Sequence, residues 1–189
     1  MTQNKLNKLN GQLIKAAEHG DTKRVRELLD SGAEINAKDI NGENALMKAS
    51  AAGWAETVKL LLDARADIDI QDKFGRTALM LSAAYGRADT VKLLLDAGAD
   101  IDRPNKYGWT ALMQAAMWGH TGVMELLIQA GADVDIRDSD SRTAFDMLKE
   151  DHPEQYDQWI RDTAVKHRKA NLKREDSAYV SECVPDFNI

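Results

Sequence analysis

The chain has 189 residues, of which 43% are apolar and 30% charged, and this composition is typical of a globular domain with a hydrophobic core. Its formal net charge of −6 argues against nonspecific attraction to nucleic acid or to anionic lipid. A single cysteine, Cys183, excludes a disulfide within the chain and every metal site built on several cysteines.

The first residues, MTQNKLNKLNGQ, contain no apolar stretch of the kind found in a secretory signal. No apolar run in the sequence approaches the roughly 18–20 residues that a membrane-spanning helix needs. We therefore expect a cytoplasmic protein with no membrane partner, although export as an effector stays open.

A repeat of 33 residues runs through the middle of the chain. This step separates Asn44, Thr77, Thr110 and Thr143, and two series of glycines share it. The glycines are Gly42, Gly75 and Gly108, followed by Gly53, Gly86 and Gly119. Self-similarity at a fixed period is typical of a stacked array, because each unit buries its apolar face only against its neighbours.

Each unit is predicted to contain two short helices joined by tight turns. In the third unit, Thr77 is a candidate N-cap of the first helix, and Gly86 ends that helix. The second helix is expected from about Asp89 to Ala97, with apolar residues at i, i+3, i+4 spacing. The glycine that follows supplies a left-handed stop, and the segment ADID leads into a hairpin-like turn.

These units resemble the ankyrin repeat over the stretch from about Leu6 to Lys169. The motif T-A-L-M stands where the family usually has T-P-L-H, and the segment LLLDAGAD and the 33-residue step match the family well. Met47, Met80 and Met113 replace the family's histidine, so packing takes the place of a polar link between neighbouring units. The resemblance implies an all-α repeat solenoid of helix-turn-helix units with short β-hairpin-like turns, followed by a C-terminal helix and an irregular tail.

The expected domain organisation is an ankyrin repeat domain, 1–169, and a C-terminal tail, 170–189. The domain is divided into five units, of which the first and last act as caps: 6–38, 39–71, 72–104, 105–137 and 138–169. In the last unit Pro153 is well placed to open a longer helix that closes the array. Arg65 stands where the sister units have glycine. If its backbone is left-handed, it costs about 1 kcal/mol relative to glycine.

The large side chains that the units do not share fall at positions facing a concave groove in the ankyrin family. In the third and fourth units these positions hold Phe74, Tyr85, Tyr107, Trp109, Met117 and Trp118. Large amphipathic rings are over-represented among residues that dominate protein binding. We interpret the six residues as a partner-binding patch that faces outward. The alternative is that the rings pack on one another, stiffen the turns and bind nothing.

Cationic residues surround this patch in an otherwise acidic protein: Lys73, Arg76, Lys106 and Arg142. We include Arg76, Lys106 and Arg142 among the expected partner-binding residues, because they suit a partner with acidic residues flanking apolar anchors. The alternative is that the cations only neutralise nearby aspartates, which are Asp72, Asp138 and Asp140.

No motif for catalysis or metal binding is found. The histidines (His19, His120, His152 and His167) match no metal spacing, and the repeated aspartates fail the EF-hand pattern and are assigned to the scaffold. We therefore expect no enzyme activity, no cofactor and no metal. His120 is given a structural role, and Trp54 is expected to pack at the groove's edge or to cover the loop of the second unit.

The function that we expect is a non-enzymatic module that binds a partner protein through an aromatic-rich concave groove, as a monomer or weak homodimer. Two alternatives stay open: an inhibitor or immunity-type protein that occludes an enzyme, and a structural unit that self-associates. The basic run 166–174 either extends the last helix or docks on an anionic surface. The segment 175–189 is expected to be mostly irregular and to lie along the groove or the convex face of its own or a neighbouring molecule.

Overall fold

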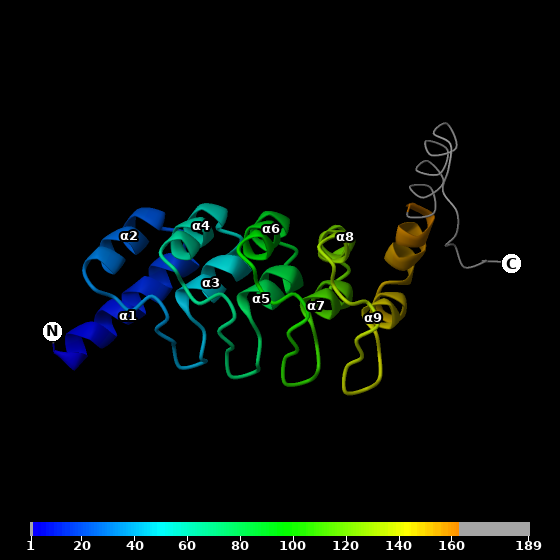
Figure 1. The fold of residues 1–189 in the computed structure, drawn as a ribbon, viewed down its shortest axis with the longest axis horizontal. Coiled ribbons are helices and arrows are strands. Elements are labelled where there is room, and N and C mark those ends of the chain that lie inside the picture. Colours follow the sequence, from blue (N-terminus) through cyan, green and yellow to red (C-terminus); the bar gives the residue numbers. More distant parts are fainter. Residues whose placement is uncertain (1, 163–189) are drawn as a thin grey trace, which may run out of the picture.

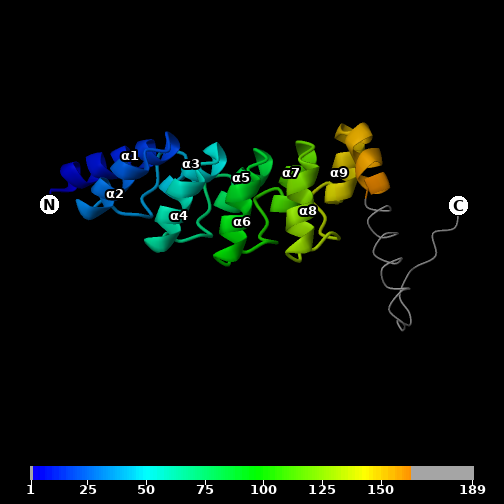
Figure 2. The same cartoon turned by 90° about the horizontal axis from the view of Figure 1, so that it is seen from above.

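The structure is a computed structural model, and it describes residues 2–162. Over this range pairs of helices stack side by side into an elongated array (Figure 1, Figure 2). One layer holds the first helices of the units: α1 (Gln3–Glu18), α3 (Ala45–Ala52), α5 (Ala78–Ala84), α7 (Ala111–Met117) and α9 (Ala144–Asp151). The other layer holds the second helices: α2 (Thr22–Asp30), α4 (Ala55–Asp63), α6 (Ala88–Asp96) and α8 (Thr121–Gln129).

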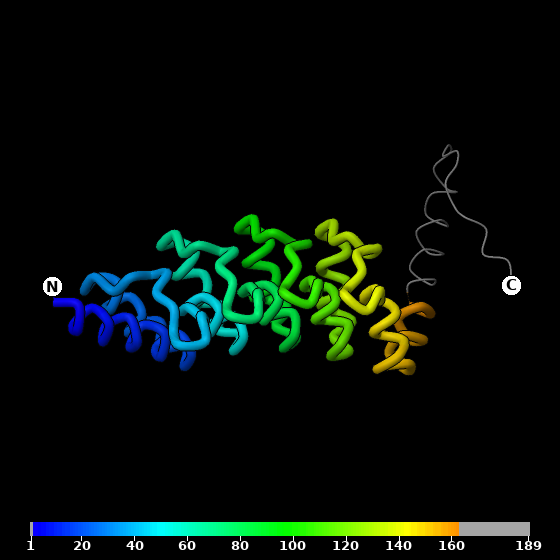
Figure 3. Tube along the Cα trace, turned by 90° about the horizontal axis from the view of Figure 1, so that it is seen from below, coloured from blue at the N-terminus to red at the C-terminus, as the bar shows by residue number. Residues whose placement is uncertain are grey.

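The regular structure in this range is helical, which confirms the predicted all-α solenoid. Each first helix contacts the first helix of the next unit, and the second helices form the parallel series of contacts. The chain therefore advances along the array one unit at a time, from the blue end to the orange end (Figure 3).

The predicted N-caps are confirmed. The Thr77 hydroxyl accepts the backbone N–H of Met80 at 3.3 Å, and the Thr110 hydroxyl accepts that of Met113 at 3.4 Å. Each cap satisfies a backbone donor that has no partner inside its helix. At α9, Thr143 and Asp146 form a reciprocal capping box, which starts the last unit in the same register as the others.

The hydrophobic core lies between and within the two helical layers. Met47, Met80 and Met113 are each only 1% exposed and belong to one continuous cluster with the leucines that precede them in sequence. The expected exchange of a polar contact for methionine packing is therefore observed. Because the cluster runs through successive units, each unit is stabilised by its neighbours.

A hairpin-like turn precedes each of α3, α5, α7 and α9, and the turns project to the same side of the array (Figure 1). In the third unit, Asp72 Oδ1 accepts the backbone N–H groups of Phe74 and Arg76, both at 2.8 Å. Adjacent turns are also joined, since the N–H of Lys106 donates to the carbonyl oxygen of Phe74 at 3.1 Å. These bonds hold the turns as a connected row.

The turn glycines lie close to the next turn in the row. A Cβ atom at Gly75, whose φ is 79°, would lie 2.8 Å from the backbone nitrogen of Lys106. Ser141 occupies the equivalent position in the fifth unit and keeps a φ of 65° despite its side chain. The left-handed conformation is costly for serine, but no turn follows it within residues 2–162 to meet its Cβ.

Arg65 has a φ of 63°, so the expected left-handed backbone is observed. The sister residues Gly98 and Gly131 have φ values of 86° and 97°, and a Cβ atom added to either would meet nothing within 4 Å. The penalty at Arg65 is therefore conformational and does not come from crowding.

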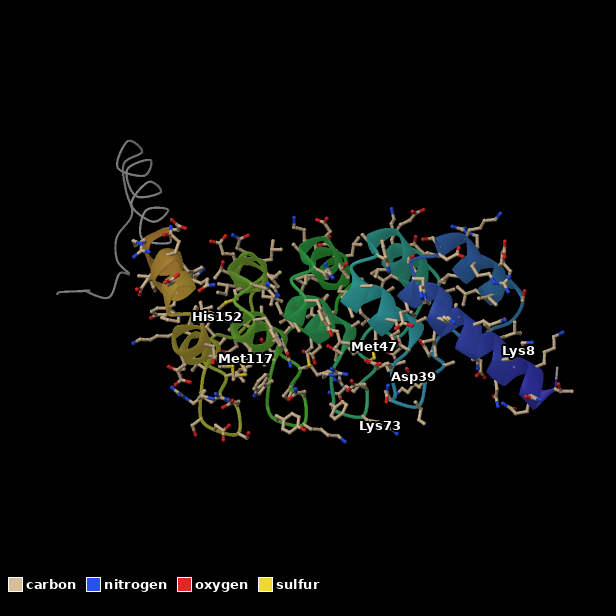
Figure 4. The ribbon with its side chains drawn as sticks, turned by 180° about the vertical axis from the view of Figure 1, so that it is seen from behind. Lys8, Asp39, Met47, Lys73, Met117 and His152 are labelled. Carbon is tan, nitrogen blue, oxygen red and sulfur yellow. The ribbon has the colours of Figure 1, made fainter. Side chains whose placement is uncertain are left out.

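A side-chain N–H group links each unit to the last carbonyls of the preceding first helix. The contacts join Trp54 Nε1 to the Glu18 oxygen at 3.0 Å, Arg87 Nε to the Ala51 oxygen at 3.2 Å, His120 Nε2 to the Ala84 oxygen at 3.1 Å and His152 Nε2 to the Met117 oxygen at 2.9 Å. Figure 4 shows the last of these pairs, with His152 beside Met117. The structural role expected for His120 is present, and His152 shares it.

Trp54 does not lie where it was expected. A Cβ atom at Gly20 would lie 2.5 Å from the indole ring of Trp54, so the ring covers the turn of the first unit. It neither covers the loop of the second unit nor lines the groove described below.

The two ends of the array differ from the internal units. Helix α1 begins at Gln3, whereas the first unit was predicted to start at Leu6. Beyond α9, the residues 153–162 are helical, and the ring of Trp159 lies 5.0 Å from that of Phe145. The unit boundaries remain predictions, and the expectations for 166–174 and 175–189 lie outside the described residues.

Candidate protein-binding groove

An open groove of about 610 Å³ lies between the turns and the first helices of the third and fourth units. All six large residues expected to form a patch line it: Phe74, Tyr85, Tyr107, Trp109, Met117 and Trp118. The remaining lining residues are Arg76, Leu81, Ala84, Asn105 and Gln114. The register of the repeat thus brings together side chains up to 44 residues apart in the sequence.

Four of the groove rings are strongly exposed. Phe74, Tyr85, Tyr107 and Trp118 have exposed fractions between 49% and 61%. Within residues 2–162 the observed ring–ring contact is between Phe145 and Trp159, at the closing end of the array. The groove rings therefore form no stacked pair with one another in this range.

Trp109 and Met117 are less exposed than the other four residues. Trp109 is half-buried, and its indole N–H donates to Asp138 Oδ2 in the next unit at 3.1 Å. Met117 ends α7 and is also half-buried. These two side chains form the inner part of the groove wall, whereas the exposed rings form its rim.

Asp138 is ionised in the folded protein, although its side chain is inaccessible to solvent. Burial raises the pKa of this carboxyl, but hydrogen bonds from the backbone and side chain of Arg142, together with the N–H of Asp140, outweigh burial and lower the pKa overall. A permanent acceptor therefore positions the indole of Trp109.

Two of the predicted cations are already paired. Arg76 Nε lies 2.7 Å from Asp72 Oδ2, and the guanidinium lies over the Phe74 ring at 5.2 Å from its centroid. Arg142 lies 3.0 Å from Asp138 Oδ2 and is not part of the groove lining. For these two residues the structure favours the alternative of neutralising nearby aspartates.

The two lysines at the turn ends behave differently. Lys73 and Lys106 are exposed, and neither has a carboxylate within ion-pair distance in the part of the chain that the structure describes. Figure 4 shows Lys73 at the free end of its turn. Neither lysine lines the groove itself, but each directly precedes a groove ring in sequence, namely Phe74 and Tyr107.

Two amide side chains that the sequence analysis missed lie in the groove lining. Asn105 and Gln114 are 9% and 8% exposed. Asn105 Oδ1 accepts the N–H groups of Tyr107 and Trp109, but its Nδ2 has no hydrogen-bond partner among residues 2–162. The side-chain amide of Gln114 has no hydrogen-bond partner in that range either, and neither amide group is among the solvent-inaccessible atoms left without a bond, so both open onto the groove. The available signal was that neither amide occurs at the equivalent positions of the other units.

The repeated aspartates serve the scaffold, as expected. Asp69 Oδ1 accepts the backbone N–H of Asp100 at 3.1 Å, and Asp102 Oδ1 accepts that of Asp133 at 3.0 Å. Within residues 2–162 no group of three or more histidine, cysteine, aspartate or glutamate side chains is placed to hold a metal ion. No helix in that range has the length and apolar character required to cross a membrane.

Comparison with known families agrees with this architecture. A model of ankyrin repeats, three copies long, matches residues 13–105 and 51–138, which together make up more than half of the chain. The chain therefore belongs to the ankyrin repeat family. Ankyrin repeats are generally protein–protein interaction modules and are typically non-enzymatic. No curated protein matches the chain.

Proposed function

We propose that this chain is a non-enzymatic module that binds a partner protein through the groove of its third and fourth units. The observation that supports this proposal most directly is the set of four half-exposed rings around one open groove. A contiguous apolar patch on a protein surface is typical of an interaction site. Burying the part of one such ring that is still exposed contributes about 1–1.5 kcal/mol, roughly half of the value for a fully exposed side chain.

The groove also has the rigidity that favours binding. Asn105 Oδ1 orders the turn that presents Tyr107, and the backbone bond from Lys106 to Phe74 joins that turn to the preceding one. A surface that is already ordered loses little conformational entropy when a partner binds. The partner-binding residues in this proposal are the six large groove residues, with Lys106 at the rim.

The proposal is tested with a variant in which the four exposed rings are removed: Phe74→Ala/Tyr85→Ala/Tyr107→Ala/Trp118→Ala. The matched control is Ile40→Ala/Ile160→Ala, which removes exposed apolar side chains outside the groove. Circular dichroism first establishes that both variants keep the helical content of the wild type. We expect the wild type and the control to retain the same saturable partner from a lysate, and the groove variant to lose it.

Identical sets of retained proteins for the wild type and the groove variant would contradict the proposal. Light scattering over a range of concentrations, measured on the same three proteins, distinguishes self-association. A homodimer that dissociates only in the groove variant would assign the rings to contacts between copies of this chain, and the proposal of a separate partner would then fail.

A further inference from the structure

We infer that the occupant of the groove is an extended peptide segment of the partner, with a main-chain amide bound by Asn105 and Gln114, an apolar side chain among the rings and an adjacent carboxylate at Lys73 or Lys106. This inference rests on the proposed function and specifies the chemistry of the partner at that same site. It begins from two amide groups in the groove lining, Asn105 Nδ2 and the side-chain amide of Gln114, which have no hydrogen-bond partner within residues 2–162.

Two sister units show that an apolar side chain fits the position of Gln114. The equivalent positions in the third and fifth units hold Leu81 and Met147, which are buried in the core. An amide at a position that is otherwise apolar buries less apolar surface than these residues do and therefore contributes less to stability. Gln114 nevertheless lines the groove without an observed partner in the described part of the chain. A ligand that bonds to it would supply the missing reason for this residue.

The same comparison applies to Asn105. The equivalent residues in the other turns are Asp39, Asp72 and Asp138, and each uses Oδ1 to accept the same two backbone N–H groups. Asn105 keeps that function through its own Oδ1. Asn105 differs from the three aspartates only in its Nδ2 group. This group is a neutral hydrogen-bond donor, whereas the aspartates have a carboxylate oxygen at the same place.

The two amides together match a peptide main chain. Asn105 Nδ2 donates, whereas the Gln114 amide both donates and accepts, so the pair can satisfy one carbonyl oxygen and one N–H group. The main-chain groups inside a helix are already bonded to each other, so only an extended or irregular segment offers them. This chemistry favours an extended peptide over a helix laid in the groove.

The charges around the groove indicate which type of residue lies next to the apolar anchor of the bound peptide. Several rings around one site would also suit an alkylated ammonium group. No carboxylate lines the groove, however, so no side chain of the lining would pair with a cation. Lys73 and Lys106 have no ion-pair partner within residues 2–162 and lie next to Phe74 and Tyr107 in sequence. A carboxylate next to the apolar anchor complements them.

The experiment uses the full chain and substitutions taken from its own sister units. A random dodecapeptide library displayed on phage is selected on the wild type, after depletion on the variant without the four exposed rings. We expect the retained peptides to share one large apolar residue with Asp or Glu close to it. One of these peptides, made synthetically, is then titrated against Asn105→Asp, as in Asp72, and against Gln114→Leu, as in Leu81.

Gln114→Leu is expected to weaken binding of the peptide by about tenfold or more, the effect of losing one hydrogen bond, without lowering the melting temperature. Asn105→Asp is expected to weaken binding at least as much but also to lower the melting temperature, because Trp109 stands where Arg76 and Arg142 pair with the sister aspartates. Methylation of the bonded main-chain nitrogen of the peptide is expected to weaken the wild-type complex similarly. Replacing the peptide carboxylate by its amide is expected to weaken binding to the wild type but not to Lys73→Ala/Lys106→Ala.

Three outcomes overturn the inference. They are equal affinity for the wild type and both amide variants, selection of peptides whose shared residue is cationic, and failure to retain any peptide. If the lysate experiment still shows a partner that the groove variant no longer retains, the proposed function stands. Only the inference that the groove holds an extended peptide then fails. If that experiment also shows no difference, the proposed function itself fails.

Discussion

Three equivalent positions of the second and fourth units, in the turn and the first helix, carry side chains of opposite character. The second unit has Asp39, Glu43 and Lys48, whereas the fourth unit has Asn105, Trp109 and Gln114. In the second unit the lysine is paired with both acids, and Arg76 of the third unit lies 3.2 Å from Glu43. In the fourth unit every one of these charges is replaced by a neutral side chain.

This difference shows that one backbone supports both a surface closed by ion pairs and an open apolar groove. Burial lowers the pKa of Lys48, but its hydrogen bond to Glu43 and the charges of Glu43 and Asp39 raise it overall, so the lysine keeps its charge between the two acids. The groove keeps unsatisfied amides and exposed rings instead. We interpret the side chains that break the repeat as the residues selected for function.

The largest effect is expected from transferring the second unit's residues to the fourth, in the variant Asn105→Asp/Trp109→Glu/Gln114→Lys. Arg142 is placed to pair with the introduced glutamate, as Arg76 pairs with Glu43, so the fold is expected to persist. Partner binding is expected to weaken by about 100-fold or more, because an anchoring ring and two amides are lost. Circular dichroism and a pull-down measure the two properties, and unchanged binding would refute our assignment of the groove.

Asp138→Asn is expected to lower the free energy of unfolding at pH 7 by about 1–2 kcal/mol, because a buried acceptor of charged and neutral hydrogen bonds is lost. The folded-state pKa of Asp138 is lowered, so its contribution is fully present above the unfolded value of about 3.9 and is lost as the pH falls through the folded value.

The measurement for Asp138→Asn is urea unfolding at pH 7 and at pH 3, with Asp140→Asn as an exposed control. The difference between the wild type and Asp138→Asn is expected to shrink at the lower pH. A difference that stays constant between the two pH values would show that ionisation of this carboxyl does not stabilise the fold.

Gln114→Leu is expected to stabilise the fourth unit by about 1 kcal/mol, because the side chain found at Leu81 buries apolar surface where the amide buries little. Chemical unfolding measures the gain, and peptide titration measures the accompanying loss of affinity. A loss of stability would mean that the amide has a structural partner.

Lys48→Leu makes the matched change in the second unit and is expected to act in the opposite direction. Removing the cation between Glu43 and Asp39 is expected to cost about 0.5–1 kcal/mol, the range for a partly exposed ion pair. High salt screens the pair, so the loss is expected to decrease in sodium chloride. A salt-independent loss would instead indicate lost packing of the lysine stem.

Arg65→Gly is expected to have the smallest effect, a stabilisation of about 0.5–1 kcal/mol, because glycine adopts the left-handed conformation without a Cβ penalty. The equivalent residue of the fourth unit, Gly131, already has this advantage. Differential scanning calorimetry tests the change, and partner binding serves as the control because Arg65 does not line the groove. A lower melting temperature would show that the arginine side chain stabilises the fold by contacts.

The repeat period made most of the fold predictable from sequence. The step of 33 residues placed Thr77 and Thr110 at helix N-caps and put six non-repeating residues on one groove. It did not reveal how completely Arg76 and Arg142 are paired, since that depends on the side-chain geometry of the turns.

The two amides of the groove were also hidden from the sequence analysis, for a physical reason. A repeat pattern marks large apolar deviations from the consensus as exposed, whereas Gln114 stands at a position that is apolar and buried in two sister units. Asn105 differs from its aspartate counterparts by a single terminal atom, and its use in the turn is the same. Only burial and the missing hydrogen-bond partners distinguish these residues.

Ser141 has a consequence for engineering longer versions of this protein. A Cβ atom at the turn residues of internal units would lie 2.8–3.2 Å from the backbone of the following turn. A sixth unit docked after the fifth with the same geometry would therefore be crowded by the Ser141 side chain, and the turn of the new unit would have to shift. Ser141→Gly removes this crowding, whereas a copy inserted between the third and fourth units brings its own glycine.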